Sequence, residues 1–94
     1  MKISEVKAGM NVSIEAEVIG IEAPREINRE GRVLRVANAL LRDDTGTISL
    51  VLWNENIDKI KEGDFIKIDD GFCKTWQDKL QITLGRNGKL TVLD

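Results

Sequence analysis

The feature that most constrains the fold is a repeated alternation of apolar and polar residues in short segments of the chain. In residues 11–21 and 47–54, every second residue is aliphatic, and many of these residues are β-branched. A period of two with β-branched residues is typical of a strand that buries one face. Shorter apolar segments at 32–42, 65–69 and 80–84 predict three further strands.

The connections between these segments support the same interpretation. Residues 32–42 are apolar on both parities, so a helix is an alternative there. The charged loop expected at residues 24–31 and the turn expected at Asp43–Gly46 favour a strand between them. We expect a short polar helix or turn at residues 56–61 and a polar hairpin loop at residues 74–79.

Five strands in a chain of 94 residues need closure to avoid exposed sheet edges. A small all-β Greek-key barrel with a short helical connection between strands 3 and 4 meets this need, and it is the plan of the OB fold. An SH3-like barrel is the main alternative, but it usually lacks the helical connection. The length allows one domain, so we expect residues 1–94 to form a single barrel.

Residue types exclude several kinds of chemistry. The chain has one cysteine, Cys73, and no histidine, so an intrachain disulfide and histidine-based catalysis are excluded. A zinc site needs several such ligands. The acidic pairs Asp43–Asp44 and Asp69–Asp70 are candidates for Mg²⁺, but at turns and strand ends we interpret them as solvated or hydrogen-bonded to turn amides. We therefore expect no metal, no cofactor and no enzymatic activity.

No apolar run approaches the roughly 18 residues that cross a membrane, and residues 1–10 lack an apolar signal core. We expect a cytoplasmic protein without membrane partners.

The net charge of −2 argues weakly against a nucleic-acid partner. However, basic residues are in excess in segments 23–42 and 71–93, and acidic residues in 55–70. These basic segments either face a phosphate backbone or are scattered solvated charges.

The two tryptophans are candidate binding residues. Trp53 lies on the strand parity opposite Ile48, Leu50 and Leu52, so either a stacked nucleobase or the segment that follows covers it. Trp76 falls in the predicted polar loop with Lys74 and Lys79 on either side. It either stacks on a base while the lysines bind phosphate, or folds back over the barrel mouth.

The two phenylalanines are less informative. Phe72 shares parity with Ile66 and Ile68 and would be buried, unless a bulge at Gly71 turns it outward. Both orientations remain open from the pattern alone. Phe65 follows a Gly-Asp turn and is expected to pack at a barrel end.

The chain resembles single-domain single-stranded DNA-binding proteins and the OB domains of archaeal replication protein A. The resemblance rests on the Asp43-Asp44-Thr45-Gly46 turn, the following strand that ends in Trp53, Gly63-Asp64, and the segment from Phe72 to Ile82. It implies binding of single-stranded DNA, largely without sequence preference, in replication and repair. It also implies three stacking aromatics, which map onto Trp53, Phe72 and Trp76.

The same resemblance implies basic contacts from the first loop and second strand. The candidates are Arg29, Arg32 and Arg35, and Arg86 matches a basic position of some members, although a solvated turn explains Arg86 equally well. Replication and repair proteins are the expected protein partners. Two alternatives stay open: a protein-interaction OB domain in which Trp53 anchors a partner, and RNA binding, because a stacking surface does not easily reject a 2′-OH.

Overall fold

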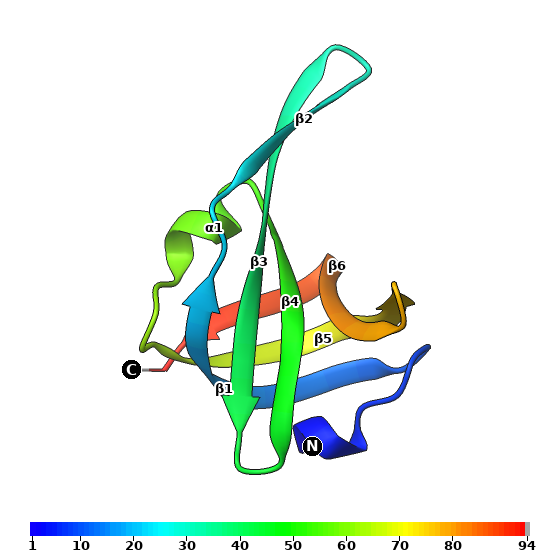
Figure 1. The fold of residues 1–94 in the computed structure, drawn as a ribbon, viewed down its shortest axis with the longest axis vertical. Coiled ribbons are helices and arrows are strands. Elements are labelled where there is room, and N and C mark those ends of the chain that lie inside the picture. Colours follow the sequence, from blue (N-terminus) through cyan, green and yellow to red (C-terminus); the bar gives the residue numbers. More distant parts are fainter. Residues whose placement is uncertain (94) are drawn as a thin grey trace.

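The computed structural model describes residues 1–93, with the side chain of Arg86 left out. Within these residues the strands are β1 (Asn11–Ile21), β2 (Arg25–Arg29), β3 (Arg32–Asp43), β4 (Gly46–Trp53), β5 (Phe65–Trp76) and β6 (Lys79–Val92). A 3₁₀ turn, η1 (Ile3–Glu5), precedes β1, and a short helix, α1 (Asn56–Lys59), joins β4 to β5 (Figure 1). No helix in this part of the chain has the length and apolar character to cross a membrane.

Five of the strands close into a barrel. Their order is β1-β5-β6-β4-β3, and pairing of β1 with β3 from Glu17–Arg42 to Ile21–Ala39 closes the circle. The helix α1 lies between the third and fourth barrel strands, β4 and β5. This confirms the predicted five-stranded OB-fold barrel with its short helical connection.

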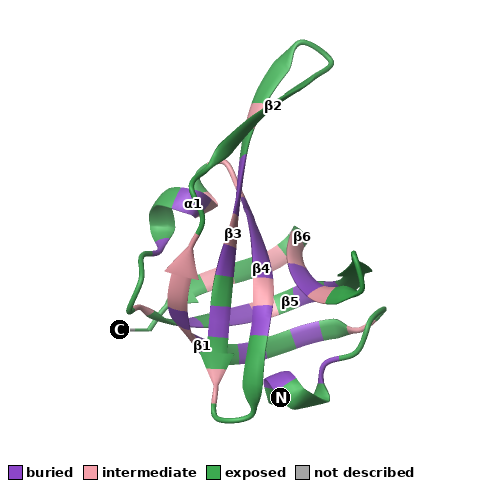
Figure 2. Ribbon diagram, in the orientation of Figure 1, coloured by how far each residue is buried: buried purple, intermediate pink, exposed green. Residues whose placement is uncertain are grey.

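The charged segment before β3 is not the predicted loop. It forms β2, which pairs with the start of β3 in a hairpin that projects beyond the barrel (Figure 1). The hairpin turns at Glu30 and Gly31, with φ of 52° and 78°, as a two-residue turn of primed type requires. Every residue of β2 is exposed (Figure 2), so backbone pairing forms this strand without the apolar alternation that identifies the others.

The core confirms the predicted parity of β4. Ile48, Leu50 and Leu52 point inward and are buried, whereas Trp53 is half-buried on the outer face. Burial of one such side chain stabilises the fold by about 1.5–3 kcal/mol. The largest completely buried side chains come from four strands: Leu41, Leu50, Leu52, Ile66, Ile68 and Ile82.

The strand β5 is longer than predicted, and no polar loop covers residues 74–79. The strand continues to Trp76 and turns into β6 through Gln77 and Asp78, both with positive φ (50° and 63°). This is again a two-residue hairpin turn, formed here without glycine. Within β5 the pairing register shifts beside Asp70, whose φ is 56°.

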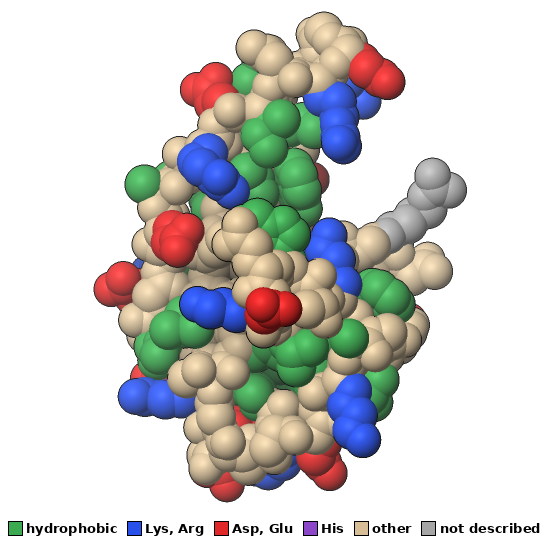
Figure 3. Space-filling model, turned by 45° about the vertical axis from the view of Figure 1, so that its right-hand side comes forward, with side chains coloured by type: hydrophobic (Ala, Val, Ile, Leu, Met, Phe, Trp, Pro, Cys, Tyr) green, Lys and Arg blue, Asp and Glu red, His purple; other side chains and the backbone are tan. Residues whose placement is uncertain are grey.

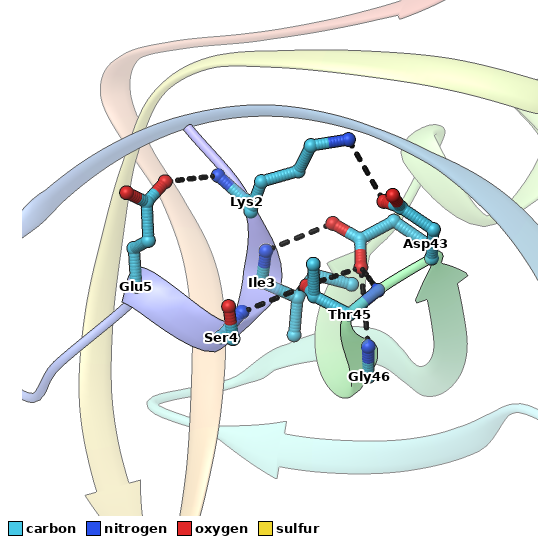
Figure 4. Close-up of polar contacts among 8 residues, drawn as sticks. Lys2, Ile3, Ser4, Glu5, Asp43, Thr45 and Gly46 are labelled. Atoms are coloured by element: carbon cyan, nitrogen blue, oxygen red, sulfur yellow. Dashed lines mark hydrogen bonds and ion pairs between the residues drawn. The ribbon is translucent and has the colours of Figure 1, made fainter.

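The Asp43–Gly46 turn joins the N-terminal segment to the barrel (Figure 4). The carboxylate of Asp43 accepts hydrogen bonds from the Thr45 hydroxyl (2.6 Å), the Thr45 N–H (2.7 Å), the Ile3 N–H (2.8 Å) and the Gly46 N–H (3.2 Å). Desolvation raises the pKa of Asp43, but these hydrogen bonds outweigh it and lower the pKa to about 2. The aspartate therefore has a structural role: it fixes η1, and with it Ile3, over one end of the barrel.

Candidate nucleic-acid interface

The outer face of the barrel beside the hairpin is built from the exposed sides of β5, β6, β4 and β3. Because paired residues in a sheet lie on the same face, the register arranges their outward side chains in rows across the strands. The rows are Trp76 and Lys79; Lys74, Gln81 and Ser49; Phe72, Thr83, Val51 and Asn38; and Trp53, Val36 and Arg25.

A groove of about 180 Å³ opens on this face, and we call it the tryptophan groove. Its nine lining residues are Arg25, Ile27, Val36, Asn38, Val51, Trp53, Lys74, Trp76 and Gln81. Figure 3 shows hydrophobic side chains gathered below the hairpin with Lys and Arg side chains on both sides of them. The lining thus combines two tryptophans, two cations and no acidic side chain.

Three larger hollows of about 390 to 450 Å³ also indent the described surface. One of them lies beside Met1, Phe65 and the Asp43–Asp44 turn. None of the three has a tryptophan in its lining, and each contains at least one charged side chain beside apolar ones. We therefore choose the tryptophan groove as the candidate site for its two tryptophans, which can stack on bases, and not for its size.

All three predicted stacking residues reach this outer face. Trp76 is 53% exposed, Phe72 is 42% exposed, and Trp53 is half-buried in the groove wall. Phe72 points outward because the register shift at Asp70 exchanges the two faces of β5, so that Gly71 and Cys73 point inward instead. Phe72 lies at the end of the row that contains the lining residues Val51 and Asn38, but it is not itself part of the lining.

The predicted basic residues separate into three groups. Lys74 lines the groove and Lys79 lies beside Trp76. The β2–β3 register places Arg29 and Arg32 together at the hairpin tip, on the side that carries the groove-lining Arg25. Arg35 lies on the opposite side of the hairpin, and its guanidinium approaches Asp58 of α1 at 3.4 Å.

One predicted basic contact, Arg86, lies on β6, and its side chain is outside the described part of the structure. Sequence reasoning missed Arg25 as a groove residue because its segment was expected to be a loop. If residues 25–29 are assigned to a strand, Arg25 and Arg29 fall on the same face as Ile27, since residues two apart share one face of a strand.

The ion pairs of the described residues lie outside the groove. They join Lys2 to Asp44 and Arg42 to Glu17, both at 2.8 Å, in addition to the Arg35–Asp58 contact and a longer pair within β5. The groove cations Arg25 and Lys74 take part in none of these pairs. Although the net charge of the chain is −2, the two groove cations have no carboxylate partner among the described residues.

A closed five-stranded barrel with a helix between its third and fourth strands, and with exposed aromatic side chains on one face, defines an OB-fold domain. Comparison with known families agrees with this assignment. The chain belongs to the family of OB-fold nucleic acid binding domains, whose model matches residues 12–86.

Two archaeal proteins are similar to this chain in sequence. The chain is 27% identical over 90 residues to the single-stranded DNA binding protein Ssb of Saccharolobus solfataricus, a match to 95% of this chain and 61% of that protein. It is 39% identical over 72 residues to replication factor A of Methanothermobacter thermautotrophicus, a match to 72% of this chain and 9% of that protein. The chain thus spans less than two thirds of either relative.

A solved structure gives the same fold along the whole chain. The solution structure of a replication factor A related protein from Methanobacterium thermoautotrophicum superposes with a TM-score of 0.84 at 31% identity. The superposition covers 100% of this chain and 90% of that one.

Proposed function

We propose that residues 1–94 act as one binding domain for single-stranded DNA, without chemistry on it. The observation that carries the proposal is that Trp53 and Trp76 line a single groove together with Lys74 and Arg25. Stacking of a base on an aromatic ring contributes about 1–3 kcal/mol and tolerates every base. The names of the archaeal relatives, a single-stranded DNA binding protein and a replication factor A, support the same function.

In this mechanism Trp53, Phe72 and Trp76 stack bases while cations hold the phosphates. Phe72 and Trp76 lie four residues apart on one face of β5, about 13 Å at the usual rise per residue. That separation exceeds the thickness of one base, so the two rings contact different nucleotides. Lys74 lies between them on the same face, where it is placed for the phosphates that link those nucleotides.

The proposed role follows from the mode of binding. A surface that stacks bases competes with base pairing, so the domain removes hairpins and shields strands that are opened during replication and repair. Replication and repair proteins are the protein partners that we propose for such a coated strand. Binding of this kind is largely indifferent to sequence and weakens with salt.

The proposal is tested by titrating the protein with a dT oligomer at two salt concentrations while tryptophan fluorescence is recorded. We expect strong quenching that weakens at the higher salt concentration. With a labelled oligomer, Trp53→Ala and Trp76→Ala should each reduce affinity about 5- to 150-fold, the equivalent of one lost stack. Phe65→Ala is the matched control, because Phe65 is 42% exposed and lies outside the groove.

Two results would redirect the proposal. If the folded protein shows no quenching at low salt and no binding of the labelled oligomer, the tryptophan groove serves a protein partner instead. If a matched RNA oligomer competes better than the DNA, RNA is the ligand, since the stacking face itself has no means of rejecting a 2′-OH.

A further inference from the structure

A glutamine lies in the tryptophan groove in an unusual environment. Gln81 is 8% exposed, and it is the one buried polar residue among those that the structure describes. It lies on β6 with Lys74 of β5 on one side and Ser49 of β4 on the other. Its neighbour Ile82 points into the core, so Gln81 points outward and lines the groove.

The amide of Gln81 has hydrogen-bonding capacity that the described protein atoms do not use. None of the side-chain hydrogen bonds between described residues involves the Gln81 amide. No buried side-chain nitrogen or oxygen atom in that part of the chain is left without a partner. Both observations are explained if the amide atoms of Gln81 contact water through the opening of the groove. Its donor and acceptor groups are then hydrated in the free protein.

A ligand that fills the groove displaces this water. Covering a hydrated amide without replacing its hydrogen bonds is unfavourable, because a buried unsatisfied polar group retains its desolvation penalty. The ligand must therefore offer both an acceptor for the amide N–H₂ and a donor for the amide oxygen. Phosphate oxygens only accept, whereas the edge of a nucleobase carries donors and acceptors side by side.

We propose that the Gln81 amide hydrogen-bonds the edge of a nucleobase held in the tryptophan groove, and so reads base chemistry in a site otherwise built for stacking. This inference rests on the proposed function. Lys74, the neighbour of Gln81 in the register, meets the phosphate of the same nucleotide. Asn38, which is half-buried, adds a second amide to the same lining.

The test compares a dT oligomer with one in which every thymine is N3-methylated. The methyl group removes the N3–H donor and leaves the phosphates and the stacking face. We expect the unmodified protein to bind the methylated oligomer about 2- to 13-fold more weakly, the equivalent of one net hydrogen bond. Gln81→Met, which keeps the length and volume of the side chain, should bind both oligomers equally.

Controls separate this effect from loss of fold and from loss of binding. Thr91→Val removes a polar group from an exposed position of β6 outside the groove and should preserve the full preference. If Gln81→Met does not fold, Gln81→Leu makes the same comparison. Equal binding of both oligomers by the unmodified protein, or a preference retained in both Gln81 variants, overturns the inference and leaves the proposed function intact. Absence of binding to either oligomer refutes both.

Discussion

Gly71 permits the close packing that places the groove residues, and Gly71→Ala tests this. A Cβ atom at this position would lie 2.8 Å from Cγ2 of Ile82 and 3.0 Å from Cγ2 of Ile68. Carbon atoms pack at about 3.5–4.0 Å, so at least one methyl group must move by about 0.7 Å. Both isoleucines are completely buried and have no free space toward solvent. We expect Gly71→Ala to destabilise the domain by about 1–3 kcal/mol, the usual cost of overpacking a core.

Urea and thermal unfolding, followed by circular dichroism, measure this change. Each 1 kcal/mol should lower the melting temperature by about 4–8 °C in a domain of this size. Gly85→Ala is the matched control, because its Cβ would meet no atom within 4 Å and its φ is not positive. Ile82→Leu, which deletes the offending Cγ2 methyl, should cost less in the Gly71→Ala background than alone. Equal stability of Gly71→Ala and Gly85→Ala would refute the packing argument.

Three further predictions concern charge and reactivity. The lowered pKa of Asp43 means that its contribution to stability is complete above about pH 4 and is lost as the pH falls toward 2. Asp43→Asn should therefore lower the melting temperature at neutral pH and flatten its decline between those two pH values; an unchanged acid profile would contradict this role. If Arg29 and Arg32 each bind a phosphate, replacing either by Ala should reduce the slope of log affinity against log salt concentration by about 0.7. Arg42→Ala is the control, because it breaks an ion pair with Glu17 and should leave this slope unchanged. Burial raises the pKa of the Cys73 thiol, although a hydrogen bond with the Gln81 backbone opposes this shift. Because Cys73 is buried and its thiol is poorly ionised, a thiol reagent should modify it far more slowly in the folded protein than in the urea-unfolded protein.

The barrel was predictable where burial imposes a pattern on the sequence. The strands β1 and β4 alternate in polarity because one face meets the core, and both were predicted to within a residue or two. The hairpin strand β2 and the end of β5 lie outside the core, and their exposed residues carry no such alternation. Their strand structure depends on backbone pairing and on two turns that use non-glycine residues at positive φ, which composition does not reveal.

The candidate site was predictable in its two tryptophans and in Lys74, but not in Gln81. An exposed tryptophan is costly enough to stand out, so Trp53 and Trp76 were identified from parity and position. Gln81 has no such signal, because it alternates with Leu80 and Ile82 as any outward polar residue of a strand does. Its burial depends on the parallel pairing of β6 with β4, which closes the barrel and brings Ser49 beside it. Such a pairing joins segments 32 residues apart, and no local pattern encodes it.

A single backbone position decides which side chains of β5 lie on the outer face that carries the tryptophan groove. With strict alternation from Ile66 and Ile68, Phe72 and Trp76 would point into the core and Cys73 into solvent. Asp70 adopts a positive φ where β5 carries one extra residue relative to β1, so the alternation resumes on the other parity. Because the same shift brings Gly71 against the Ile68 and Ile82 methyl groups, core packing is coupled at this bulge to the positions of the candidate binding residues. A substitution that removed the bulge would therefore turn Phe72 and Trp76 away from the outer face while leaving the composition of the domain almost unchanged.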